Sequence, residues 1–212
     1  MTLQYLFFDT YVGDFLQVVP VALLAGGLCL LVRVRLARRR GLLVRWPREI
    51  AMALFVCYLA GLWALVLTPN NLWTKVWYFL FYHQDSGNTI TWLVLDPAQW
   101  SFDLSLGLFR RFTRENAGNM LLFLPMGVFL PLLWPRLRLG RTVGLSALIS
   151  AVVELGQLLI GRAFDASDLI LNTVGALLGA LVLLALRRLL PGGLRQCAPA
   201  EGARRNGKER PR

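Results

Sequence analysis

Apolar residues in this sequence form long runs that are separated by short blocks of charge. Five runs, at residues 15–32, 50–68, 119–135, 142–160 and 169–186, are each close to the length of a bilayer-crossing helix. Such a helix needs about 20 apolar residues for a hydrocarbon core of about 30 Å. The pattern therefore predicts an all-α fold: a polytopic transmembrane helix bundle of about five spans. The share of hydrophobic residues, 56%, agrees with this class and exceeds that of ordinary soluble domains.

Basic residues lie mainly in three segments, 33–49, 136–141 and 187–212, each of which follows an apolar run. Because cytoplasmic loops of membrane proteins carry an excess of Lys and Arg, these segments define the predicted cytoplasmic side. We therefore expect a multi-pass protein of the cell membrane with its N-terminus outside and its C-terminus in the cytoplasm. The same placement accounts for the net charge of +11 without a basic binding face, which argues against nucleic acid as a partner.

The predicted organisation follows from these runs and from the side on which each loop lies. Residues 1–14 form an external N-terminus, 15–68 the first two spans with the basic loop 33–49, 69–118 an external aromatic-rich loop, 119–186 a three-helix core, and 187–212 a basic cytoplasmic tail. The tail is rich in Gly, Pro and Arg and lacks periodicity, so we expect disorder there. In the third span, Pro125 and Pro131 predict a kink.

The long external loop is unusually apolar at its start, where the sequence reads NLWTKVWYFLFYH. Trp and Tyr are enriched at membrane interfaces, because their rings are apolar and one end of each is polar. We therefore predict interfacial helices in this loop, one over 71–82 and a second over 104–116. Two interpretations stay open: a lid over the bundle, or a surface that faces a lipid or ligand.

Polar side chains inside the apolar spans are the main sign of function, because such groups are costly in a hydrocarbon environment. Glu154 lies within the fourth span, and Gln157, three residues later, shares its helix face. Asp168 precedes the fifth span at a position suited to an N-cap, and Asn172 shares its face. The predicted topology brings these groups to one depth together with the polar start of the third span.

We predict that these helix ends form a polar site open to the outer leaflet. Its predicted binding residues are Arg114, Asn119, Glu154, Gln157, Arg162, Asp165, Asp168 and Asn172. One interpretation gives the site a ligand or a reaction, with Glu154 as the candidate catalytic residue. The other interpretation is structural: Glu154 pairs with Arg162 or Arg114, and Gln157 with Asn172, as hydrogen-bonding links between helices.

Metal and covalent chemistry have little support in the residue types present. The three cysteines have no CxxC spacing, and His83 is the single histidine, so no metal site and no cofactor are expected. One alternative stays open, a divalent cation shared by Asp165 and Asp168, because carboxylates three residues apart can bind one cation together.

An ordered set of residues in the last three spans also matches a known pattern. The matching positions are Asn119, Phe123, Pro125, Gly127, Glu154, Gln157, Gly161, Arg162, Asp165, Asp168, Asn172, Gly175 and Gly179. With this set the segment resembles the VanZ-like family, whose members are associated with resistance to teicoplanin and related lipidated glycopeptides. Residues 1–110 match only loosely. The resemblance implies a role in antibiotic resistance or in the cell envelope and does not specify a reaction.

Two classes of function therefore remain. The first is a non-enzymatic envelope protein whose site binds a membrane lipid, a lipid-linked wall precursor or the acyl tail of a lipoglycopeptide. The second is a small intramembrane enzyme that acts on a lipid or lipid-linked headgroup, with Glu154 as a general base. No internal repeat favours a transporter, although a homo-oligomer is an open alternative.

Overall fold

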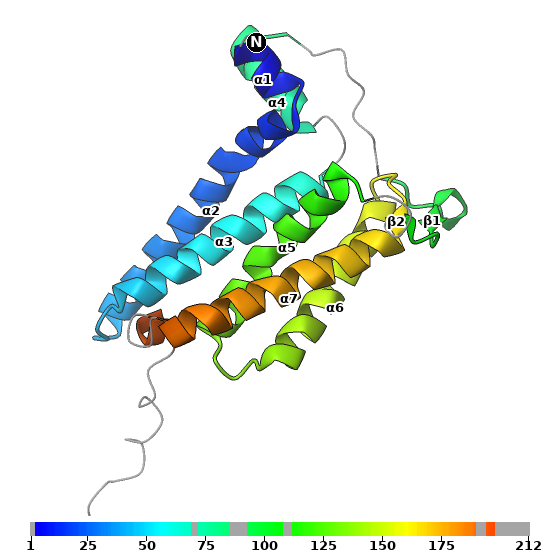
Figure 1. The fold of residues 1–212 in the computed structure, drawn as a ribbon. Helices are drawn as coiled ribbons and strands as arrows, with labels where there is room; N and C mark the ends of the chain where they lie inside the picture. Colours follow the sequence, from blue (N-terminus) through cyan, green and yellow to red (C-terminus); the bar gives the residue numbers. More distant parts are fainter. Residues whose placement is uncertain (1–2, 69–71, 85–92, 108–111, 190–193, 198–212) are drawn as a thin grey trace, which may run out of the picture.

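The computed structural model describes residues 3–68, 72–84, 93–107, 112–189 and 194–197. Within this part the helices are α1 (Leu3–Phe8), α2 (Tyr11–Arg39), α3 (Trp46–Val66), α4 (Leu72–Tyr82), α5 (Arg114–Leu133), α6 (Leu139–Leu158) and α7 (Ala166–Leu189). Two short 3-10 helices, η1 (Pro97–Gln99) and η3 (Leu194–Cys197), and the two-residue strands β1 (Phe102–Asp103) and β2 (Phe164–Asp165) complete it. The predicted all-α class is confirmed (Figure 1).

Five of these helices, α2, α3, α5, α6 and α7, are long and apolar enough to cross a membrane. They correspond to the five predicted spans, and they identify a multi-pass membrane protein. The helices begin and end a few residues away from the apolar runs, most clearly in α2. Arg38 and Arg39 continue its last turn, where positive charge complements the helix dipole. The chain leaves the helix at Gly41, which has the positive φ of 65° that glycine tolerates best.

Helices α5 and α7 cross so closely that only glycine fits at three positions. A Cβ atom on Gly127 would collide with the carbonyl oxygen of Ala176, and one on Gly175 or Gly179 would collide with the backbone of α5. Small residues allow membrane helices to approach in this way and to gain van der Waals contact. The α5–α7 contact is therefore the structural centre of the three-helix core.

Helix α5 runs without interruption through both of its prolines. A third proline, Pro135, follows the helix and has no N–H to donate to the carbonyl of Pro131 four residues earlier. The guanidinium of Arg187, at the end of α7, donates to that carbonyl oxygen at 2.6 Å. The bond secures the second end of the α5–α7 pair.

Helices α2 and α3 form a separate antiparallel pair that lies beside this core (Figure 1). Gly26 of α2 lies against Cys57 and Ala53 of α3. The pair reaches the core through α3, where the hydroxyl of Tyr58 donates to the carbonyl oxygen of Leu122 at 2.8 Å. A close-packed bundle results, with its most polar groups at the helix ends.

Helices α1 and α4 lie side by side at the start of α2 (Figure 1). The buried side chain of Gln17 holds both, because it donates to the carbonyl oxygen of Phe7 and accepts a hydrogen bond from Thr74. The predicted helix over 71–82 is confirmed as α4, and its position at a membrane interface stays a prediction. The predicted helix over 104–116 is wrong for most of its described residues: 104–107 and 112–113 are not α-helical, and only 114–116 are, as the start of α5.

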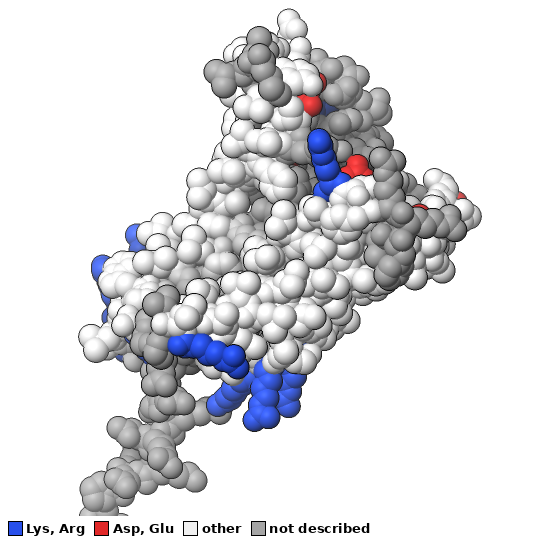
Figure 2. All heavy atoms as spheres, in the orientation of Figure 1, with Lys and Arg blue, Asp and Glu red and all other residues white. Residues whose placement is uncertain are grey.

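Charge is distributed unequally between the two ends of the bundle (Figure 2). Lys and Arg gather where α2 ends and α3 begins, and where α6 begins and α7 ends. Acidic side chains lie near the opposite end, close to the short strands. This asymmetry follows the basic segments of the sequence, and the assignment of the basic end to the cytoplasm stays a prediction. Of the predicted tail 187–212, residues 187–189 belong to α7 and 194–197 to η3, and the rest lies outside the described residues.

Candidate functional site

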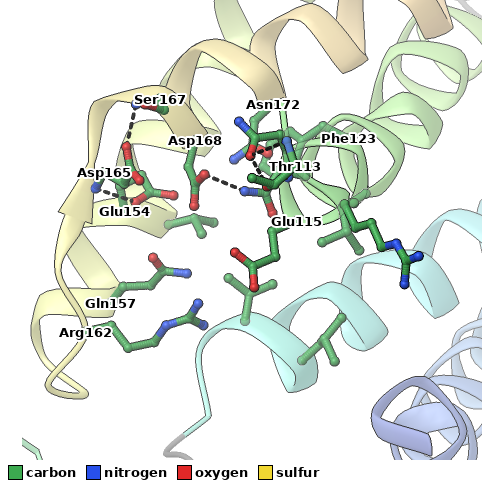
Figure 3. A pocket seen from close by; sticks show the side chains of 18 of the residues that line it. Thr113, Glu115, Phe123, Glu154, Gln157, Arg162, Asp165, Ser167, Asp168 and Asn172 are labelled. Atoms are coloured by element: carbon green, nitrogen blue, oxygen red, sulfur yellow. Dashed lines mark hydrogen bonds between the residues drawn. The ribbon is translucent and has the colours of Figure 1, made fainter. Parts of the chain in front are cut away.

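A cavity of about 720 Å³ lies where α5 and α7 begin and α6 ends. Its lining includes every residue of the predicted site: Arg114, Asn119, Glu154, Gln157, Arg162, Asp165, Asp168 and Asn172. Figure 3 shows several of these side chains directed into one space from different helices. The structure thus brings the predicted residues together, while their role in binding stays a prediction.

The end of α6 turns the chain sharply and presents Arg162 to this cavity. The N–H of Arg162 donates to the carbonyl oxygen of Gln157 at 3.0 Å, and the N–H of Gly161 donates to that of Leu158 at 3.2 Å. Gly161 has a φ of 74°, so this pair of bonds is a Schellman motif with glycine at its left-handed position. The turn explains why a Gly-Arg sequence follows the polar face of α6.

Glu154 is 1% exposed, although it lies on an apolar helix. One oxygen of its carboxylate accepts a hydrogen bond from the backbone N–H of Asp165 at 3.2 Å. The carboxylate of Asp165 in turn accepts from the N–H of Ser167 at 2.6 Å, in the first turn of α7. The predicted N-cap at Asp168 is therefore wrong, because α7 begins two residues earlier. Asp165, directly before the helix, accepts the hydrogen bond from the first-turn N–H of Ser167 that an N-cap residue would accept.

Asp168 and Asn172 lie one turn apart on the same face of α7, as predicted, and each contacts a different helix. The amide nitrogen of Asn119 on α5 donates to the carboxylate of Asp168. The amide nitrogen of Asn172 donates to the hydroxyl of Ser150 on α6 at 2.9 Å. The amide oxygen of Asn172 is buried and accepts no hydrogen bond within the described residues. A buried acceptor of this kind normally has a partner.

The pairings expected from a purely structural role differ from those found. Within the described residues, no salt bridge and no hydrogen bond joins the Glu154 side chain to Arg162 or Arg114. Asn172 contacts Ser150 and not Gln157, because Ser150 lies one turn from Glu154 on the face of α6 that meets α7. The arginines are exposed at the edge of the cavity, where they remain accessible to a ligand.

Several lining residues were not anticipated from the sequence. Thr113 and Asn116 form a reciprocal capping box that fixes the start of α5, and their spacing is a recognisable signal. Asp103 comes from the external loop, because β1 pairs in parallel with β2 and places Asp103 opposite Asp165. Asp14 comes from α2. No local signal predicts these last two contacts, since both depend on tertiary packing.

The environment of Asp103 favours its charged form. The hydroxyl and the backbone N–H of Ser105 both donate to its carboxylate, and they hold the pKa of Asp103 below its usual value. Asp103 therefore adds a fixed negative charge at the rim of the cavity over the whole physiological pH range.

The cavity combines this polar surface with an apolar wall. The apolar side chains come from four helices and are Phe15, Leu65, Val66, Leu122, Phe123 and Val153. In the described part of the chain, no group of three or more His, Cys, Asp or Glu side chains is arranged to hold a metal ion. The arrangement suits a ligand with one polar and one apolar part.

Comparison with known proteins identifies a family for most of this chain. The model of a family described as VanZ/LLP1 matches residues 55–187, which include α5, α6, all but the last two residues of α7, the second half of α3 and every residue of the predicted site. No curated protein matches the chain. No solved structure matches it.

Proposed function

Because this chain belongs to the VanZ/LLP1 family, we propose that it is a membrane protein that binds an amphiphile in this cavity. The amphiphile is a membrane lipid, a lipid-linked wall precursor or a lipoglycopeptide, and the role is in glycopeptide resistance or envelope homeostasis. The observation that supports the proposal is a cavity with buried polar groups on one side and an apolar wall on the other.

Polar burial argues for a ligand rather than for packing alone. Glu154, Gln157 and Asn172 are each less than 5% exposed, yet they border an open cavity at a helix end. Ionisable groups in membrane spans are costly and usually mark a functional pathway or site. If only packing were required, an apolar side chain at position 154 would fill the same space without that cost.

The size and shape of the cavity suit a headgroup with the beginning of an acyl chain. Its volume of about 720 Å³ lies within the range of about 300–1,000 Å³ that is typical of small-molecule sites. A complete lipid is larger than this, so its tails would extend past Phe15 and Leu65 into the bilayer.

The inhibitory concentrations of teicoplanin and vancomycin, measured in a susceptible Gram-positive host that expresses the protein, test this proposal. Expression of the protein is expected to raise the inhibitory concentration of teicoplanin but not that of vancomycin, which lacks an acyl tail. Glu154→Gln and Asp168→Asn are expected to abolish the rise at equal expression. Asp9→Asn, a carboxylate on the same end of the bundle but outside the cavity lining, is the matched control.

Two further results would change the proposal. A teicoplanin response that survives both cavity variants would separate resistance from this site. Release of a headgroup from phospholipid by the purified protein, lost in Glu154→Gln, would favour the intramembrane enzyme instead.

The same proposal places the cavity at the external leaflet. A reporter fused after Cys197 is then cytoplasmic, and one inserted beside Asp96 in the long loop is external. The reverse pattern would move the cavity to the cytoplasmic face and make an external antibiotic an implausible ligand.

A further inference from the structure

We infer that the amphiphile taken by this cavity carries a primary ammonium group, an inference that rests on the proposed function and specifies its ligand. Two observations support this inference: carboxylates outnumber basic groups around the cavity, and the buried amide oxygen of Asn172 has no hydrogen-bond partner in the described residues. Together they describe a site with more negative than positive charge and with a buried acceptor that has no donor in the described residues.

Acidic side chains outnumber basic ones in the lining. The acidic residues are Asp14, Asp103, Glu115, Glu154, Asp165 and Asp168, and the basic residues are Arg114 and Arg162. Charges of one sign that line a cleft with low-dielectric walls concentrate ions of the opposite sign. A cationic group is therefore favoured at this place, and an anionic headgroup without an amine is disfavoured.

Hydrogen bonding inside the cavity points to the same ligand. The amide nitrogens of Asn119 and Asn172 already donate to Asp168 and Ser150. The amide oxygen of Asn172, a residue that is 4% exposed, has no donor within the described residues. Glu154 and Asp168 each use one carboxylate oxygen in the described side-chain contacts.

An ammonium group supplies what these acceptors lack. It has three N–H donors and no acceptor, so it can donate to an amide oxygen and to two carboxylates at once. Bonds of this kind between charged partners are about twice as strong as neutral ones. A quaternary amine carries the same charge but no N–H, so it would leave the Asn172 oxygen unpartnered.

The two arginines fit the remaining part of such a headgroup. Arg114 and Arg162 are exposed at the edge of the cavity, while Glu154 and Asn172 are buried within it. A guanidinium binds a phosphate through paired N–H donors. The ammonium would thus lie deep, the phosphate between the ammonium and the bilayer, and the acyl chains against the apolar wall.

The test compares lipids that share their acyl chains and differ in headgroup. Native mass spectrometry of the full-length protein would measure competition among phosphatidylethanolamine, phosphatidylcholine and phosphatidylglycerol. We expect phosphatidylethanolamine to bind about tenfold more tightly than phosphatidylglycerol and severalfold more tightly than phosphatidylcholine. Asp168→Asn keeps an acceptor for Asn119 but removes a charge. It should therefore reduce the preference for phosphatidylethanolamine over phosphatidylglycerol severalfold.

Glu154→Gln provides a second test of the same preference, and Asp9→Asn again serves as the control. Equal binding of phosphatidylethanolamine and phosphatidylglycerol, both weakened by the cavity variants, would overturn the ammonium inference and leave the proposed function intact. Equal binding of phosphatidylethanolamine and phosphatidylcholine would also overturn it, because N–H donors would then be unnecessary. Lipid binding that no cavity variant changes would overturn the proposed function itself.

Discussion

The two buried glutamates in the described part of the chain lie in different regions and have opposite surroundings. Glu49 belongs to the α2–α3 pair, and both of its carboxylate oxygens accept hydrogen bonds from the guanidinium of Arg33. Glu154 belongs to the three-helix core of α5, α6 and α7, and its described contact is one backbone N–H beside an open cavity. One charge is neutralised within the fold, and the other remains available.

The same contrast extends to the other buried polar side chains. In the helix pair, Gln17 uses both its amide nitrogen and its amide oxygen to hold α1 and α4. In the core, Ser146 and Asn172 each retain a buried polar atom without a partner in the described part of the chain. Arg48 of α3 also has such an atom, its Nε, so the contrast lies between Gln17 and Asn172. Gln17 uses both ends of its amide to hold elements together, whereas Asn172 uses only its nitrogen.

Adding a side chain at the α5–α7 crossing should have the largest effect on stability. Gly127→Ala places a Cβ against the backbone of Ala176, which cannot move without separating the helices. We expect unfolding free energy to fall by about 3 kcal/mol, at the upper end of overpacking effects. Gly27→Ala on α2 has open space around its Cβ, and helix propensity should make it neutral or slightly stabilising.

Unfolding in mixed micelles, followed by circular dichroism as SDS is added, measures both variants. Equal transitions for the two alanine variants would show that the α5–α7 crossing does not require glycine at position 127.

Replacing each glutamate by glutamine tests the contrast directly. Glu49→Gln leaves Arg33 without its charge partner and should destabilise the protein by about 1 kcal/mol, a modest amount because Arg33 is partly exposed. Glu154→Gln removes a charge that no arginine pairs and keeps an oxygen that can accept from the N–H of Asp165, so stability should change by less than about 0.5 kcal/mol, below the net value of one hydrogen bond. The teicoplanin response should show the reverse order, with the larger loss in Glu154→Gln and the smaller in Glu49→Gln.

Thermal unfolding and the teicoplanin response, measured on the same two variants, give the stability and activity readings. A large loss of stability in Glu154→Gln would mean that Glu154 is a structural residue after all, and the case for a ligand would weaken.

The sequence was sufficient for the spans and for the eight predicted residues that line the cavity. Run length and hydropathy locate α2, α3, α5, α6 and α7, because each must bury its backbone hydrogen bonds within one apolar helix. The gathering of Glu154, Asp168 and Asn119 also followed from topology, since antiparallel neighbours bring alternate ends together. Helical spacing then placed Asn172 on the face of Asp168.

Contacts that depend on how helices rotate and on how loops return were not predictable. The position of Asp103 depends on the pairing of β1 with β2, two strands of two residues each, which have no periodicity to detect. The partner of Asn172 depends on which face of α6 meets α7. Ser150 and Gln157 each lie about one turn from Glu154. Which of them contacts Asn172 becomes clear only after the orientation of α6 is known.

The smallest predicted effect distinguishes a core hydroxyl that bonds another helix from one that has no hydrogen-bond partner in the described residues. Ser146 and Ser150 lie one turn apart on α6, and both are 0% exposed. Ser150 accepts from the Asn172 amide, so Ser150→Ala should reduce stability by about 0.6 kcal/mol, the mean for hydrogen bonds between membrane helices. The Ser146 hydroxyl has no partner in the described residues, so Ser146→Ala should be neutral or slightly stabilising. Equal effects in SDS titration would show that Ser150 does not hold Asn172. Its amide would then be free to turn, and its oxygen would no longer be a fixed acceptor in the cavity.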